Sequence, residues 1–128
     1  MKNNIFSIIK YLFYFSLIIL LIIYLFPGSL IGYILYGNIG RQPDFILNPI
    51  GTSINHLIFF FYLSILGFIF RNNQTKFINS FSFLFLISII LELLHYFIPN
   101  RAFELIDLYA NSLGVLLAFF MLKFFKKT

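Results

Sequence analysis

Apolar residues in this chain are gathered into four runs, each about long enough to cross a lipid bilayer. The runs extend over residues 9–26, 54–70, 77–98 and 106–125. A helix needs about 20 largely apolar residues to cross a hydrocarbon core roughly 30 Å thick. The pattern therefore predicts an all-α integral membrane protein, a four-helix bundle that forms a single domain over residues 1–128.

The longest predicted connection, residues 27–53, contains five of the seven glycines and three of the four prolines. Glycine and proline at this density interrupt helices, and a loop of this length is uncommon unless it has a function. Its apolar part, Leu30 to Tyr36, fits either a segment at the membrane interface or an extension of the first helix. The sequence leaves these two forms open.

Composition supports the membrane prediction. Hydrophobic residues make up 61% of the chain and charged residues only 10%, with a mean hydropathy of +0.97, which is too little polar surface to cover a soluble globule of this size. The chain has no cysteine, so thiol chemistry and disulfide bonds are excluded. The net charge of +5 is explained by topology, and we therefore expect no nucleic-acid partner.

The cations predict the orientation, because lysine and arginine concentrate on the cytoplasmic side. With both termini inside, the long first loop is extracytoplasmic, and so are all four acidic residues and the two arginines Arg41 and Arg101. No small-residue cleavage motif follows the first run, which predicts an uncleaved anchor helix. The other seven cations then face the cytoplasm: Lys2, Lys10, Arg71, Lys76, Lys123, Lys126 and Lys127.

One polar stretch, Glu92 to Gly114, interrupts the apolar pattern and holds three of the four acidic residues. A carboxylate within a span is costly unless it faces protein or water, so Glu92 is a candidate functional group. Residues three and four apart share a helix face, and the turn Pro99-Asn100-Arg101 joins two such faces into an antiparallel hairpin. The faces expected to meet are Ser88, Glu92 and His95 on one helix, and Asp107, Asn111, Gly114 and Ala118 on the next.

These side chains predict a small extracytoplasmic pocket, roofed by the long first loop. Arg101 is placed to bridge Glu92 or Asp107, or to bind the phosphate or carboxylate of a ligand in a bidentate manner. The deeper glycine and alanine of the hairpin are expected to allow close helix packing. The residues expected to line the pocket are His56, Glu92, His95, Arg101, Asp107 and Asn111.

The same residues also fit purely structural roles. Glu92 and Arg101 can form an ion pair that only fixes the hairpin, and Asp107 can cap the N-terminus of the last helix. His95 at a helix end fits an interfacial histidine. The sequence does not decide between these roles and ligand binding.

Three kinds of chemistry can be weighed against the spacing. Glu92 and His95 form a single E-x-x-H pair, whereas di-iron bundles need two pairs and further carboxylates, so we expect no metal and no cofactor. No serine has the surroundings of a hydrolase nucleophile. Acid–base work by Glu92, assisted by His95 or His56, remains open, because burial raises the pKa of a carboxyl group towards neutrality.

The second half of the chain resembles the VanZ-like family of small membrane proteins. The resemblance extends over about Thr52 to Ala118, and His56 fits a histidine at the head of a span. Thr52 and Ser53 stand where the family has Asp and Lys, His95 replaces a glutamine, and Asn100 replaces a turn glycine. The residues that carry the match are Glu92, Pro99, Arg101, Asp107, Ala110, Asn111 and Gly114.

The resemblance implies a four-span protein of the bacterial cytoplasmic membrane, associated in one case with resistance to a glycopeptide-type antibiotic. It implies no known reaction. One hypothesis is an envelope-associated binding or accessory module among membrane lipids, whose pocket recognises an anionic or glycan-bearing ligand. The alternative is an enzyme that acts on an outer-leaflet lipid-linked substrate, with Glu92 as general acid or base.

Overall fold

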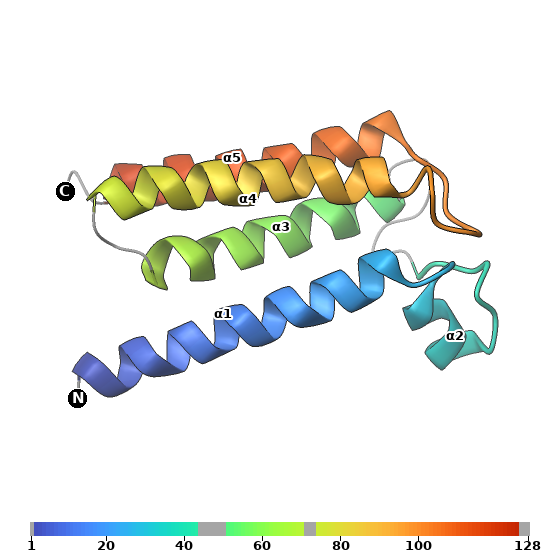
Figure 1. The fold of residues 1–128 in the computed structure, drawn as a ribbon, viewed down its shortest axis with the longest axis horizontal. Coiled ribbons are helices and arrows are strands. Elements are labelled where there is room, and N and C mark those ends of the chain that lie inside the picture. Colours follow the sequence, from blue (N-terminus) through green and yellow to red (C-terminus); the bar gives the residue numbers. More distant parts are fainter. Residues whose placement is uncertain (1, 44–50, 71–73, 126–128) are drawn as a thin grey trace.

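A computed structural model describes residues 2–43, 51–70 and 74–125, and the side chains of residues 4–43, 51–70 and 80–125. Within these ranges the chain is all-helical, with five helices and no strand (Figure 1). The helices are α1 (Lys2–Leu25), α2 (Leu30–Tyr36), α3 (Gly51–Phe70), α4 (Gln74–Leu94) and α5 (Leu105–Phe125).

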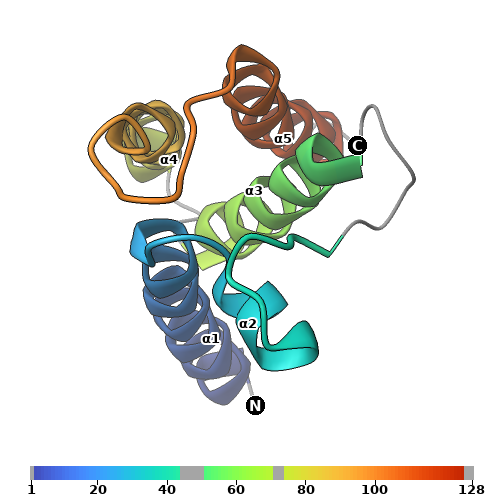
Figure 2. The same cartoon turned by 90° about the vertical axis from the view of Figure 1, so that its right-hand side faces the viewer.

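The four long helices lie alongside one another and alternate in direction along the chain (Figure 1). The N-terminal end of α1 and the C-terminal end of α5 therefore lie at the same end of the molecule. The short helix α2 and the α4–α5 connection lie at the opposite end. Viewed from that end, α3 lies between α1 and α5 (Figure 2), and its most extensive packing is against α5.

Three helices of the described chain are long and apolar enough to cross a membrane. They are Asn4–Leu25, Gly51–Phe70 and Leu105–Phe125, while the apolar part found in α4, Ser80–Leu94, is shorter. Large apolar side chains of α1 point away from the core, among them Tyr11, which is 71% exposed. A helix surface of this kind is favourable in lipid rather than in water, which indicates a membrane protein.

A glycine sets the spacing between α3 and α5. A Cβ added at Gly114 would lie 2.5 Å from the carbonyl oxygen of Leu57 and 2.9 Å from the backbone nitrogen of Phe61. Any larger residue would push the two backbones apart, so Gly114 allows the close approach expected from the sequence. Its partner, however, is α3 and not the other arm of the α4–α5 hairpin.

The first loop contains the segment whose form the sequence left open. Leu30–Tyr36 is a separate helix, because Ser29 caps it and Gly37 ends it in the left-handed conformation with φ 65°. The chain then returns over this helix, and the backbone nitrogen of Ser29 donates to Ile39 O at 2.6 Å. Asp44 and Pro49, also expected in this loop, lie outside the described residues.

Helix boundaries differ from the predicted spans, most clearly at the start of α1, at the starts of α3 and α4, and at the end of α4. α1 begins at Lys2 and α3 at Gly51, each several residues before the apolar run, because polar residues extend a helix beyond the apolar segment. α4 ends at Leu94 and continues in tighter turns, with Phe97 N donating to Leu94 O at 2.9 Å. The following Asn100 has φ 59°, a conformation that glycine adopts most readily and asparagine tolerates.

Candidate functional site

The six predicted pocket residues belong to α3, α4, α5 and the α4–α5 connection, which come together at the end of the molecule that carries α2 (Figure 1). The alternating helix directions produce this gathering, since each long helix contributes the end that faces the same way. α3 contributes His56, α4 and the turn after it contribute Glu92 and His95, the connection contributes Arg101, and α5 contributes Asp107 and Asn111.

Glu92 is the centre of a buried polar network and is 0% exposed. Its Oε1 accepts from His95 Nδ1 at 3.2 Å and from the backbone N–H of Glu104 at 3.3 Å. Its Oε2 accepts from Asn111 Nδ2 at 3.2 Å and lies 3.6 Å from His56 Nδ1. The carboxylate therefore joins α4 to the start of α5 and to α3, and the predicted meeting of the hairpin faces is confirmed at Glu92 and Asn111.

Tyr24, from the last turns of α1, connects this network to a further helix. Its hydroxyl donates to Asn111 Oδ1 at 2.8 Å, since a carbonyl oxygen can only accept. The same hydroxyl lies 2.8 Å from His56 Nδ1. Because its single proton is used on Asn111, the hydroxyl accepts from His56, and the imidazole proton lies on Nδ1.

Asp107 occupies the first turn of α5 and is 6% exposed. Its Oδ1 accepts a hydrogen bond from the hydroxyl of Ser53 on α3. Its Oδ2 lies 3.6 Å from His56 Nε2, so the imidazole of His56 stands between two carboxylates, Glu92 on one side and Asp107 on the other. Asp107 thus ties α5 to α3 across the site in addition to its place at a helix N-terminus.

Arg101 does not form the predicted bridge, and in the described part of the chain it forms no salt bridge with Glu92 or Asp107. Its Nε donates to Phe26 O at 3.3 Å and its Nη2 to Ile23 O at 2.7 Å. The carbonyls at the C-terminal end of a helix lack intrahelical donors and attract positive charge. The guanidinium of Arg101 therefore binds the C-terminal end of α1. Partial burial lowers the pKa of Arg101, while Glu92 and Asp107 oppose the shift.

A cavity of about 210 Å³ lies over this network and under the first loop. The predicted roof is confirmed for its described part, since Ser29, Ile39 and Gln42 line the cavity. His95 also lines it, and its Nε2 is a buried atom with no hydrogen-bond partner among the described residues. Of the six predicted residues, four line this cavity: His56, His95, Arg101 and Asp107.

Asn111 and Glu92 are not in the cavity wall. Asn111 is 0% exposed and uses its amide on Glu92 and Tyr24. We therefore assign it, with Glu92, to the support beneath the cavity. Direct contact of Asn111 with a ligand stays a prediction, and the described geometry places its amide on protein partners.

The sequence analysis missed two members of the network, Tyr24 and Ser53. A tyrosine near the end of an apolar run is common at a membrane interface, so Tyr24 gave no distinguishing signal. Ser53 stands where the VanZ-like pattern has the lysine of an Asp-Lys pair, and it contacts Asp107. That departure was the available signal for Ser53.

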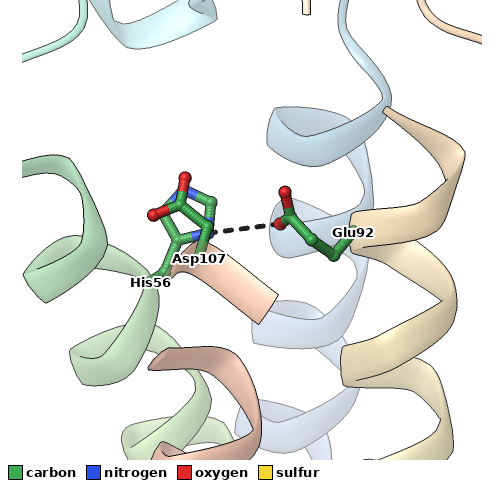
Figure 3. Close-up of side chains that lie close together, drawn as sticks. All are labelled: His56, Glu92 and Asp107. Atoms are coloured by element: carbon green, nitrogen blue, oxygen red, sulfur yellow. Dashed lines mark ion pairs between the residues drawn. The ribbon is translucent and has the colours of Figure 1, made fainter. Parts of the chain in front are cut away.

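Three residues of the network could hold a cation. One ligand atom from each of His56, Glu92 and Asp107 lies within 4.8 Å of the other two (Figure 3). All three are buried, and each comes from a different helix. Glu92 and His95 form the E-x-x-H pair that was weighed as a metal motif in the sequence. In the structure these two residues are hydrogen-bonded to each other.

Comparison with known proteins shows the family of the chain. The model of the VanZ/LLP1 family matches residues 11–126, well beyond the half of the chain over which the resemblance was seen in the sequence. No curated protein and no solved structure matches the chain. Since the family model covers nearly all of the 128 residues, the chain belongs to the VanZ/LLP1 family.

Proposed function

We propose that this protein is a multi-pass protein of the bacterial cytoplasmic membrane with four spans and both termini in the cytoplasm. The alternating directions of the four long helices support this topology (Figure 1), as do the cations near the ends of the chain. In this orientation the cavity opens on the outer face. α4 is the fourth span, although its described apolar part, Ser80–Leu94, is shorter than a full span.

The function that the geometry supports best is binding of a polar head group at the outer membrane surface. Arg101 carries this proposal, because it lines the cavity and has no carboxylate partner among the described residues. A guanidinium so placed suits a phosphate or carboxylate group. The surrounding helix surfaces are apolar, so a ligand anchored in the outer leaflet can keep its lipid part in the bilayer.

The ligand class is therefore an anionic or glycan-bearing envelope lipid, and the protein acts as a binding or accessory module. A link to glycopeptide-type antibiotic resistance rests on family resemblance, and would follow if the bound lipid were the antibiotic's target or its neighbour. Glu92 and Asn111 support the cavity from below. Tyr24 links α1 to α5 through its hydrogen bond to Asn111, and Ser53 links α3 to α5 through its hydrogen bond to Asp107.

Lipids that co-purify with the protein test this proposal. Arg101→Gln removes the charge but keeps N–H donors for the carbonyls of α1. A hydrogen bond to a charged group contributes about 1.5 to 3 kcal/mol, and 1.4 kcal/mol is about tenfold in affinity. Mass spectrometry of extracted lipids should therefore show at least about a tenfold loss of one anionic or glycan-bearing class in this variant.

Arg41→Gln is the matched control, because Arg41 lies in the first loop at the same end of the molecule, with its guanidinium 4.1 Å from the centre of the Tyr36 ring, and does not line the cavity. Its lipid profile should equal that of the wild type. Thermal unfolding of all three proteins establishes that they are equally folded. Identical lipid profiles in the wild type and Arg101→Gln would contradict the proposal.

One observation favours the enzymatic alternative. His95 Nδ1 faces Glu92, and its Nε2 lines the cavity without a partner among the described residues. The sequence predicted Glu92 as the general acid or base of this alternative; with the geometry described above, His95 accepts a proton from a hydroxyl group of the lipid-linked substrate, and Glu92 is the positioning residue. Turnover of outer-leaflet lipid by the purified protein, abolished in His95→Gln while the fold is retained, would favour catalysis over binding alone.

A further inference from the structure

We propose that His56, Glu92 and Asp107 form a binding site for one divalent transition-metal ion, of the zinc or manganese type. Imidazole nitrogen together with carboxylate oxygens is a donor set that such ions accept. This trio differs from the Glu92–His95 pair on which the sequence argument against a metal rested. It is also independent of the proposed head-group binding, since the ion is held by the protein's own side chains.

The separations are close to those that one ion requires. Metal–ligand distances of about 2.0 to 2.2 Å place two tetrahedral ligands roughly 3.4 Å apart. His56 Nε2 and Asp107 Oδ2 are 3.6 Å apart, and the three ligand atoms lie within 4.8 Å of one another. Side-chain rotations that shorten the longest of these separations would bring the three ligand atoms to a common centre.

The hydrogen bonds leave a lone pair for an ion on each ligand residue, with Glu92 Oε2 accepting only from Asn111 Nδ2 among the described residues. His56 donates its Nδ1 proton to Tyr24, so Nε2 presents a lone pair towards Asp107 Oδ2. Asp107 Oδ1 is held by Ser53, and Glu92 Oε1 is held by His95 and by the N–H of Glu104. Outer partners of this kind fix the orientation of metal ligands in known sites.

The negative charge of the two carboxylates also favours a bound metal ion. Glu92 and Asp107 are two buried carboxylates, and Arg101, which places two of its five donors on the carbonyls of α1, forms no salt bridge with either of them in the described part of the chain. Buried charge is unfavourable unless it is compensated. Neither carboxylate has a lysine or arginine salt-bridge partner among the described residues, so a divalent ion bound by both would offset both charges at once.

An independent observation at the same place is the buried Nε2 of His95, which has no hydrogen-bond partner among the described residues and lines the cavity beside His56 and Asp107. Buried polar atoms are nearly always satisfied. This atom therefore requires a polar occupant in the cavity, and the cavity gives an ion a route to the three ligands.

Metal analysis of tag-free protein tests the site. The purified wild type is stripped with EDTA, incubated with Zn²⁺ or Mn²⁺, freed of excess ion and measured by inductively coupled plasma mass spectrometry. We expect about one equivalent of one of these ions in the wild type, and at least about a tenfold weaker affinity in Asp107→Asn. Glu104→Gln, which changes an exposed carboxylate beside the same cavity, should bind as the wild type does.

Equal binding by the wild type and Asp107→Asn would place the ion elsewhere and overturn the proposal. Absence of bound ion in the wild type would overturn it as well. If Asp107→Asn fails to fold, Co²⁺ bound to the wild type decides the question. A four- or five-coordinate Co²⁺ site gives visible absorption bands, whereas hexa-aqua Co²⁺ gives only weak ones, and the weak spectrum would refute the site.

Discussion

The contact between Glu92 and Asn111 can be tested by exchanging the carboxylate and the amide between the two positions. Asn111→Asp places a second carboxylate about 3.2 Å from Glu92 Oε2, the present distance to Asn111 Nδ2. Two unit charges at that separation repel by about 5 kcal/mol at an effective dielectric constant of about 20. Protonation of one carboxyl relieves part of this, so we expect a loss of about 3 to 5 kcal/mol in the free energy of unfolding.

The double variant Glu92→Gln with Asn111→Asp should recover much of this loss. The introduced glutamine keeps a carbonyl oxygen for His95 and for the N–H of Glu104, and its amide donates to the new carboxylate, which still accepts from Tyr24. Glu92→Gln alone can be accommodated if the hydrogen bonds through Asn111 and Tyr24 reverse direction. We therefore expect a coupling energy of about 1 to 3 kcal/mol.

The assay is reversible unfolding in mixed micelles with EDTA present, so that metal occupancy does not contribute. The wild type, both single variants and the double variant complete the cycle. Additive effects, within about 0.5 kcal/mol, would show that Glu92 and Asn111 are not in contact and would refute the hairpin geometry.

Three further changes test other parts of the network in the same unfolding assay. Tyr24→Phe leaves His56 Nδ1 and Asn111 Oδ1 without their shared partner and should cost about 1 to 3 kcal/mol; no loss would contradict the α1 contact. Gly114→Ala must move the Leu57 carbonyl by about 0.9 Å from 2.5 Å to reach ordinary contact and should cost about 1 to 3 kcal/mol. Gly67→Ala, which meets only the side-chain ends of Phe13 and Leu84, should cost less than Gly114→Ala; the reverse order would contradict the α3–α5 packing.

The positions of the long helices could be predicted because apolar runs of span length leave few alternatives. Their ends could not, because polar residues such as Lys2, Asn3 and Asn4 extend α1 beyond the apolar run. The form of Leu30–Tyr36 depends on the cap at Ser29 and the left-handed Gly37. Both residues were visible in the sequence, but neither distinguishes a separate helix from an interfacial loop.

The site could be predicted as a set of residues but not as a set of contacts. Helical spacing and the antiparallel hairpin were sufficient to bring Glu92 and Asn111 together. The ion pair of Arg101 with Glu92, one of the alternatives for Arg101, is not formed. That alternative rested only on the opposite charges within the hairpin. The carbonyls of Ile23 and Phe26 compete for the same guanidinium, and only the packing of α1 reveals them.

The central claim, that the cavity over the buried network opens on the outer face of the membrane, can be tested directly because the chain has no cysteine. Gly40→Cys places a thiol in the exposed cavity rim, and Asn4→Cys places one near the start of α1. In intact cells, a membrane-impermeant maleimide should label the Gly40→Cys variant, and it should label the Asn4→Cys variant only after permeabilisation. Labelling of Asn4→Cys but not of Gly40→Cys in intact cells would contradict the account.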